Sequence, residues 1–118
     1  MMFVFTHEDD IQNLEPDFEY MKTLHARGII ATASSAKYDF VSRFFAPIEG
    51  IDEDPVTGSA HTMLIPYWAD ELGKNEMVAR QDSMRGGTLY CKYLEERVEI
   101  AGKAVTYLTG NVLIDENN

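Results

Sequence analysis

Residues 58–73 carry the pattern that most constrains how this chain can fold. Apolar side chains recur there at helical spacing and form a wide stripe, so the segment predicts a helix that packs against other elements. The stripe consists of Ala60, Met63, Leu64, Tyr67, Trp68 and Leu72. Gly73 is well placed to end the helix. Pro66 lies inside it, where we expect a lost hydrogen bond and a kink.

Most of the remaining sequence favours strands, because short apolar or alternating runs are bounded by turn residues. The predicted strands cover residues 2–6, 28–34, 38–46, 76–81, 87–96, 97–104 and 105–114. Alternation in the third strand predicts two faces. One face holds Phe40, Ser42 and Phe44, and the other holds Val41, Arg43 and Phe45. Turns are expected at 84–87, 95–96 and 102–103.

A second helix is predicted over residues 17–28, after an acidic turn at 7–17. Its apolar face would consist of Phe18, Met21, Leu24 and His25. Asp17 or Asn13 is placed to cap it, and Gly28 to end it. The element order β-α-β-β-α-β-β-β-β describes one α+β domain over residues 1–118, with a mostly antiparallel, curved sheet around or against the helices. We expect the last residues, 115–118, to fray.

Composition narrows the class of protein. A chain of 118 residues, 45% of them hydrophobic, suits one small domain with a real core. A formal net charge of -10 argues against nucleic acid and anionic membranes as partners. The single cysteine, Cys91, cannot form an internal disulfide. No apolar run approaches a membrane span, and no basic-then-apolar leader is visible, so we expect a cytoplasmic protein.

The stretch DPVTGSAH, residues 54–61, is the best candidate for a functional site. The first N–H groups of a helix have no partner within the helix, and their dipoles favour an anion. Gly58 lets a ligand approach the backbone, and Ser59 and Ala60 are small. Asp54 lies close enough in sequence to hold a proton beside such an anion. The segment therefore predicts a cradle for a carboxylate or phosphate.

Ordinary helix capping by Thr57 or Asp54 explains the same letters, and it stays open as an alternative. A phosphate loop of the GxxxxGK[ST] type does not fit, because the spacing and the lysine are missing. His61 follows the cradle and could contact a ligand, cap the helix or face solvent.

Other reactive side chains favour plainer interpretations. His7 and His25 have no metal-ligand spacing, so no metal site is predicted. Cys91 lacks a neighbouring base and is expected to be a packed residue. Arg80, Gln81 and Arg85 could line a cleft for an anion, but the sequence favours exposed positions at a rim.

The block RFFAPIEGIDEDPVTGSAH resembles the C-terminal half of the PhzF-like isomerase/epimerase family, the phenazine-biosynthesis type. The similarity continues through PYWADELGK, ARQDSMRGG and VTYLTGNV, and back through LEPDFEYMKTLHARGIIATA. It implies a diaminopimelate-epimerase-like fold, in which two similar domains each wrap a curved sheet around a central helix. The active site of that fold lies between the domains.

The resemblance also implies roles. Asp54 would be the partner acid or polar group of a glutamate from the other domain. The backbone N–H groups of Gly58, Ser59 and Ala60 would hold a substrate carboxylate. The chemistry would be cofactor-independent proton transfer on a small anionic metabolite, with neither metal nor organic cofactor. Relatives carry a Gly-Arg-Pro-Ser turn where this chain has MRGG, so the resemblance assigns no role to Arg85.

Two functions follow from the length of the chain, which suits only one of the two domains. The first is the C-terminal half of such an isomerase or epimerase, inactive without the N-terminal domain that carries the glutamate. The alternative is a non-catalytic binding or assembly module that keeps the fold. In either case the apolar surface meant for a second domain needs cover, and we expect a homodimer or a separate N-terminal-domain partner.

Overall fold

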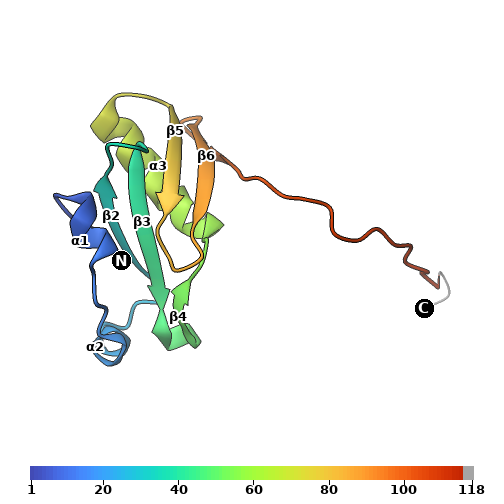
Figure 1. Cartoon of the computed structure of the whole chain (residues 1–118), viewed down its shortest axis with the longest axis horizontal. Coiled ribbons are helices and arrows are strands. Elements are labelled where there is room, and N and C mark those ends of the chain that lie inside the picture. The colour runs from blue at the N-terminus through green and yellow to red at the C-terminus, as the bar shows by residue number, and fades with distance from the viewer. Residues whose placement is uncertain (116–118) are drawn as a thin grey trace.

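A seven-stranded mixed sheet dominates the structure, a computed structural model that describes residues 1–115. Three α-helices and one short 3-10 helix connect its strands (Figure 1). In chain order the elements are β1 (Met2–Val4), α1 (Glu8–Gln12), α2 (Phe18–Thr23), β2 (Ile29–Ser34), β3 (Phe40–Ala46), η1 (Pro47–Glu49), β4 (Ile51–Asp54), α3 (Gly58–Leu72), β5 (Glu76–Gln81), β6 (Gly87–Tyr93) and β7 (Val98–Ala101).

The strand order is β1-β2-β3-β5-β6-β7, and β4 pairs with β3 off this path. Parallel pairing joins β1 to β2 and β3 to β5, whereas the other four strand pairs are antiparallel. The predicted α+β class with a mostly antiparallel sheet is therefore confirmed. β3 is the central element, because its first half pairs with β5 and its second half with β4.

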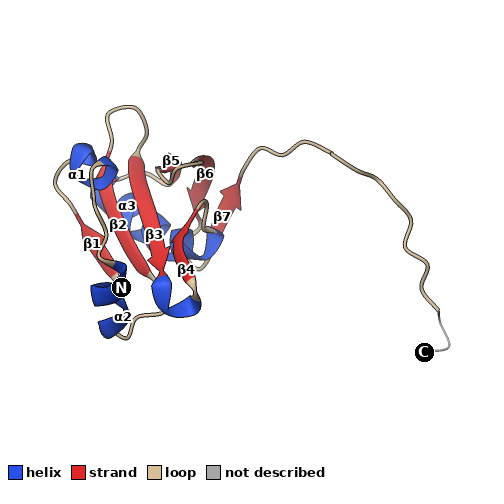
Figure 2. Cartoon of the chain, turned by 60° about the horizontal axis from the view of Figure 1, so that its bottom comes forward, coloured by secondary structure: helices blue, strands red, loops and turns tan. Residues whose placement is uncertain are grey.

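Each face of the sheet has its own core, and β3 contributes to both by alternation. Phe40 faces α3, where Trp68 stacks on it with ring centroids 5.7 Å apart. Val41 and Phe45 face the opposite way, toward α1 and α2. The two faces predicted for this strand are confirmed. Figure 2 shows α3 lying behind β2 and β3.

The helix predicted at 58–73 is confirmed as α3, and Gly73 ends it in the left-handed conformation (φ 64°). The helix continues through Pro66. Its buried face differs in part from the predicted stripe: Met63 is 51% exposed, and Leu72 is also exposed. The buried set is Ala60, His61, Leu64, Ile65, Trp68 and Ala69. With 15 residues α3 is the longest described helix, and none within residues 1–115 is long and apolar enough to cross a bilayer.

Two predictions near the N-terminus are wrong. The acidic segment contains a short helix, α1, because Ile11 is fully buried against the sheet and acids suit the first turn of a helix. The next helix, α2, ends at Thr23, well before Gly28. Its predicted cap is confirmed, since Asp17 Oδ1 accepts a hydrogen bond from the Tyr20 N–H at 2.9 Å.

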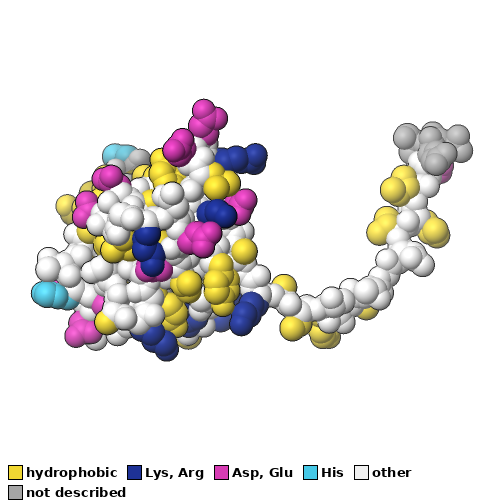
Figure 3. All heavy atoms as spheres, turned by 90° about the horizontal axis from the view of Figure 1, so that it is seen from above, with side chains coloured by type: hydrophobic (Ala, Val, Ile, Leu, Met, Phe, Trp, Pro, Cys, Tyr) yellow, Lys and Arg dark blue, Asp and Glu magenta, His cyan; other side chains and the backbone are white. Residues whose placement is uncertain are grey.

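The predictions near the C-terminus also need correction. β4 was missed, and no strand forms at 105–114. The pairing of β6 with β7 ends at Ala101, and the chain then leaves the domain (Figures 1 and 3). The apolar side chains of this segment are 80–99% exposed: Val105, Tyr107, Leu108, Val112, Leu113 and Ile114. The segment has residue types that favour a strand, but no described strand lies beside it to pair with. Of the segment expected to fray, residues 116–118 lie outside the described residues.

Candidate functional site

Helix α3 begins without the usual side-chain cap. Thr57 is the N-cap residue and has the extended backbone typical of that position (φ -121°, ψ 101°), yet its side chain makes no cap hydrogen bond. Within residues 1–115, no hydrogen bond occupies the N–H groups of Gly58, Ser59 or Ala60. The capping alternative raised by the sequence is therefore wrong. Three donors at the positive end of a 15-residue helix remain available.

A fully buried glutamine organises the turn in front of the helix. Gln81 Oε1 accepts from the Thr57 N–H at 2.8 Å. Its Nε2 donates to the Asp54 carbonyl oxygen at 2.9 Å and to Thr57 Oγ1 at 3.0 Å. The Thr57 hydroxyl in turn donates to Asp54 Oδ2. One amide group thus holds both the backbone and, through Thr57, the carboxylate of the candidate acid.

The sheet topology explains why Gln81 reaches this turn. On β3, Ser42 pairs with Gln81 of β5, and Phe44 pairs with Asp54 of β4. The last residues of β4 and β5 therefore pair with positions of β3 that are only two residues apart.

The loop between β5 and β6 supports the turn from the other side. Ser83 Oγ donates to the Pro55 carbonyl oxygen at 2.8 Å and accepts from the Gly86 N–H at 2.9 Å. Gly86 has a positive φ of 67°, which agrees with the predicted turn at 84–87. A Cβ on Gly87 would lie 2.3 Å from a methyl group of Val56. Only glycine allows β6 to approach the turn this closely.

A hollow of about 750 Å³ lies beside the helix start, between Gly58 and the strands β6 and β7. Among the described residues, Arg85 and Lys103 are the only charged ones that line it. On a chain with a net charge of -10, this local excess of positive charge favours an anion. A Cβ added to Gly58 would meet no atom within 4 Å, so the backbone there is open to a ligand.

The predicted cradle residues are adjacent but face two different spaces. Gly58 borders the hollow just described, whereas Ser59 and Ala60 border a second hollow of about 600 Å³ toward β2 and β3. Asp54 is half-buried and lines neither of them. What the three residues share is the direction of their N–H groups along the helix axis.

His61 is fully buried, so the three roles that the sequence left open for it are all wrong. Its Nδ1 lies 2.7 Å from the Thr57 carbonyl oxygen and must donate, because a carbonyl only accepts. Its Nε2 is buried and has no hydrogen-bond partner within the described residues. Burial lowers the pKa of His61, and the hydrogen bond to Thr57 partly opposes that shift. His61 is therefore a neutral packing residue that ties the first turn together.

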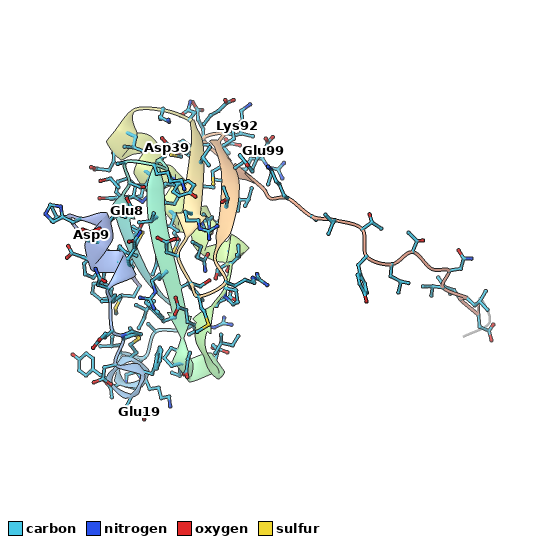
Figure 4. The ribbon with its side chains drawn as sticks, viewed as in Figure 1. Glu8, Asp9, Glu19, Asp39, Lys92 and Glu99 are labelled. Carbon is cyan, nitrogen blue, oxygen red and sulfur yellow. The ribbon has the colours of Figure 1, made fainter. Side chains whose placement is uncertain are left out.

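The other reactive side chains lie away from the helix start. Cys91 is buried, as expected, and burial raises the pKa of its thiol to about 11, with Asp39 adding to the effect. His7 and His25 are exposed. Residues 1–115 contain no group of three His, Cys, Asp or Glu side chains that could hold a metal ion. In Figure 4 the labelled acids Glu8 and Asp9 lie on α1 and Glu19 lies on α2, away from the start of α3.

Gln81 is the residue whose role the sequence did not reveal. Sequence reasoning favoured a rim position for Arg80, Gln81 and Arg85, and for Gln81 this is wrong. Arg85 does line the larger hollow. Arg80 packs beneath Gly86, where an added Cβ would clash with its guanidinium. A clue existed in the alternation of residues 76–81, since Met77, Ala79 and Gln81 share the buried face.

Comparison with known proteins identifies relatives over almost the whole chain. The phenazine biosynthesis-like protein family, PhzC-PhzF, matches residues 1–110. An uncharacterized isomerase of Pseudomonas aeruginosa is 49% identical over 112 residues, which cover 95% of this chain but 43% of that protein. Phenazine biosynthesis-like domain-containing protein 2 of Mus musculus is 50% identical over 107 residues, covering 85% of this chain and 37% of that protein.

Solved structures agree with the sequence relatives. A crystal structure of a PhzC/PhzF protein from Clostridium difficile superposes with a TM-score of 0.85 at 43% identity, covering 96% of this chain and 44% of that chain. A PhzF-family protein from Enterococcus faecalis gives 0.78 at 41% identity, covering 91% and 44%. The chain thus spans less than half the length of these relatives, and its fold is of the expected diaminopimelate-epimerase-like type. The chain belongs to the phenazine biosynthesis-like (PhzC-PhzF) family.

Proposed function

We propose that this chain supplies one side of the active site of a PhzF-like isomerase or epimerase, as the C-terminal half of the two-domain arrangement. The reaction is cofactor-independent proton transfer on a small metabolite that carries a carboxylate. The observation that carries the proposal is the uncapped start of α3, where within residues 1–115 the N–H groups of Gly58, Ser59 and Ala60 have no hydrogen-bond partner and Gly58 borders a hollow lined by Arg85 and Lys103. Family members named as isomerases support the reaction class.

The geometry suggests a division of roles. The N–H groups of Gly58, Ser59 and Ala60 bind the substrate carboxylate, and the nearby cations add attraction. One carboxylate oxygen of Asp54, Oδ2, accepts a hydrogen bond from the Thr57 hydroxyl. The other oxygen is left to contact the substrate or the proton that moves. The second proton-transfer group has to come from outside this chain, which makes the isolated chain inactive.

A titration tests the anion site directly. We expect inorganic phosphate, added to ¹⁵N-labelled chain, to shift the amide signals of Gly58, Ser59 and Ala60 in a saturable way. Gly58→Val is expected to abolish these shifts and keep the fold, because an added Cβ meets no protein atom within 4 Å and the side chain occupies the space left for the ligand. Gly110→Val, also at an unobstructed glycine, is the matched control. Equal binding by wild-type and Gly58→Val would contradict the site.

The alternative function is a non-catalytic binding or assembly module that keeps the fold. Hydrogen exchange at carbon separates the two. The chain alone, mixed with candidate 2-hydroxy or 2-amino acids in deuterium oxide, is expected to incorporate no deuterium. Adding the N-terminal half of a relative should start incorporation, and Asp54→Asn should abolish it. A mixture that binds anions but never exchanges would favour the module.

A further inference from the structure

Thr57 has the backbone conformation of a helix-capping residue, but its side chain makes no cap hydrogen bond. In an ordinary cap, the threonine oxygen accepts a hydrogen bond from the second or third N–H of the helix, which here belong to Ser59 and Ala60. Instead, Thr57 Oγ1 donates to Asp54 Oδ2 and accepts from Gln81 Nε2. Two partners outside the helix therefore keep this hydroxyl away from the N–H groups.

The orientation of the Gln81 amide follows from its backbone partners. The Thr57 N–H can only donate, so it faces Oε1, and the Asp54 carbonyl can only accept, so it faces Nε2. The second Nε2 hydrogen then points at the Thr57 hydroxyl oxygen. Because Gln81 is fully buried and all three bonds are made, the amide has no alternative partners in water.

We propose that Gln81 is a positioning residue that keeps the start of α3 uncapped and so preserves its free N–H groups for an anion. The inference rests on the proposed function, because it assigns a cause to the openness of that same site. Without Gln81 Nε2, only the hydrogen bond to Asp54 Oδ2 still holds the Thr57 hydroxyl, and a turn about the Cα–Cβ bond lets its oxygen accept from Ser59 or Ala60. The cap would then compete with the ligand for the same donors.

The test compares phosphate affinity in four proteins: wild-type, Gln81→Met, Thr57→Val and the double variant. Gln81→Met keeps the size of the side chain and removes its polar atoms. It is expected to weaken phosphate binding about fivefold, the equilibrium weight of one typical cap. Thr57→Val removes the hydroxyl with Gln81 in place and is expected to leave affinity within about twofold of wild-type.

The double variant is decisive, because without a hydroxyl there is nothing to cap the helix. We expect it to regain the affinity lost in Gln81→Met. A second readout is hydrogen exchange without phosphate, which should slow at Ser59 or Ala60 in Gln81→Met alone. Loss of affinity that Thr57→Val does not rescue would show that Gln81 acts only by holding the fold, and would overturn the proposal.

Two further outcomes separate this inference from the proposed function. If Gln81→Met does not fold, Thr57→Val alone still decides: markedly tighter phosphate binding would mean that the hydroxyl already caps the wild-type helix, contrary to the proposal. Unchanged binding would support it. If wild-type chain binds no phosphate at these amides, the proposed site itself is wrong. If wild-type and Gln81→Met bind phosphate equally well, the anion site is supported and the proposed role of Gln81 is wrong.

Discussion

At the scale of single residues, His61 should make the stability of the domain depend on pH. Its pKa is lowered in the folded state, chiefly by burial. Below a pH of about 6.5, the unfolded chain therefore takes up a proton that the folded chain refuses. As the pH is lowered through that range, the free energy of unfolding is expected to decrease. This group contributes at most about 1.4 kcal/mol per pH unit to the decrease. Above that range His61 contributes no pH dependence.

Urea denaturation of wild-type and His61→Gln between pH 7 and pH 5 measures this contribution. Glutamine keeps a donor for the Thr57 carbonyl and does not titrate. As the pH falls, the free energy of unfolding of wild-type should therefore decrease more than that of His61→Gln. His7→Gln is the matched control, since His7 is exposed. A gap that stays constant with pH would contradict a neutral, buried His61.

At the scale of elements, Arg43 of β3 joins three parts of the fold. Its Nε and Nη2 donate to the two carboxylate oxygens of Glu53 in β4 at 2.8 and 2.9 Å. Its Nη1 donates to the carbonyl oxygens of Ile11 and Leu14, at the end of α1. The side chains of Arg43 and Glu53 are only 12% and 21% exposed. Hydrogen bonds to three partner residues and the low exposure of both side chains make this pair unlike a surface ion pair.

Arg43→Met is therefore expected to lower the free energy of unfolding by about 2–4 kcal/mol, because it leaves Glu53 and two carbonyls short of donors. Chemical denaturation measures the loss. Arg27→Met is the matched control: Arg27 pairs with Glu49 while 90% exposed, so its loss should stay below about 1 kcal/mol. Similar losses in both variants would show that burial does not strengthen the Arg43 pair.

At the scale of the whole molecule, the segment after Gly102 exposes apolar side chains that nothing in the domain covers (Figure 3). A monomer rarely leaves so many of them in water. We propose that a second copy of the chain, or a separate N-terminal domain, covers them. The full chain alone is therefore expected to scatter light as a dimer at micromolar concentration.

A chain shortened to residues 1–102 is expected to be monomeric and to stay folded, because the apolar side chains of the removed segment between residues 105 and 114 are 80–99% exposed on the single chain. Size-exclusion chromatography with light scattering and a melting curve check both points. A mass of 13.4 kDa for the full chain at every concentration would rule out the dimer. Loss of the cooperative melting transition on truncation would show that the domain needs this segment in order to fold.

Features that depend on neighbours in sequence were predictable from the sequence. The stripe at 58–73 located α3, alternation gave β3 its two faces, and Gly73 marked the helix end. The sequence also predicts an anion site at the start of this helix, because small residues at a helix start are a local signal, and that site stays a prediction. Periodicity and turn chemistry act over a few residues, so one stretch of sequence contains the information that they need.

Only the tertiary structure decided what surrounds that helix start. The double pairing of β3 brings Gln81 to Asp54 and Thr57, although 24 residues separate Gln81 from Thr57. The sheet also buries His61 and leaves Met63 exposed, which helical spacing alone could not distinguish. Residues 105–114 have the propensity of a strand, but a strand exists only where another lies beside it. Strand pairing and burial depend on contacts between residues that are far apart in the sequence, so they cannot be predicted from one segment alone.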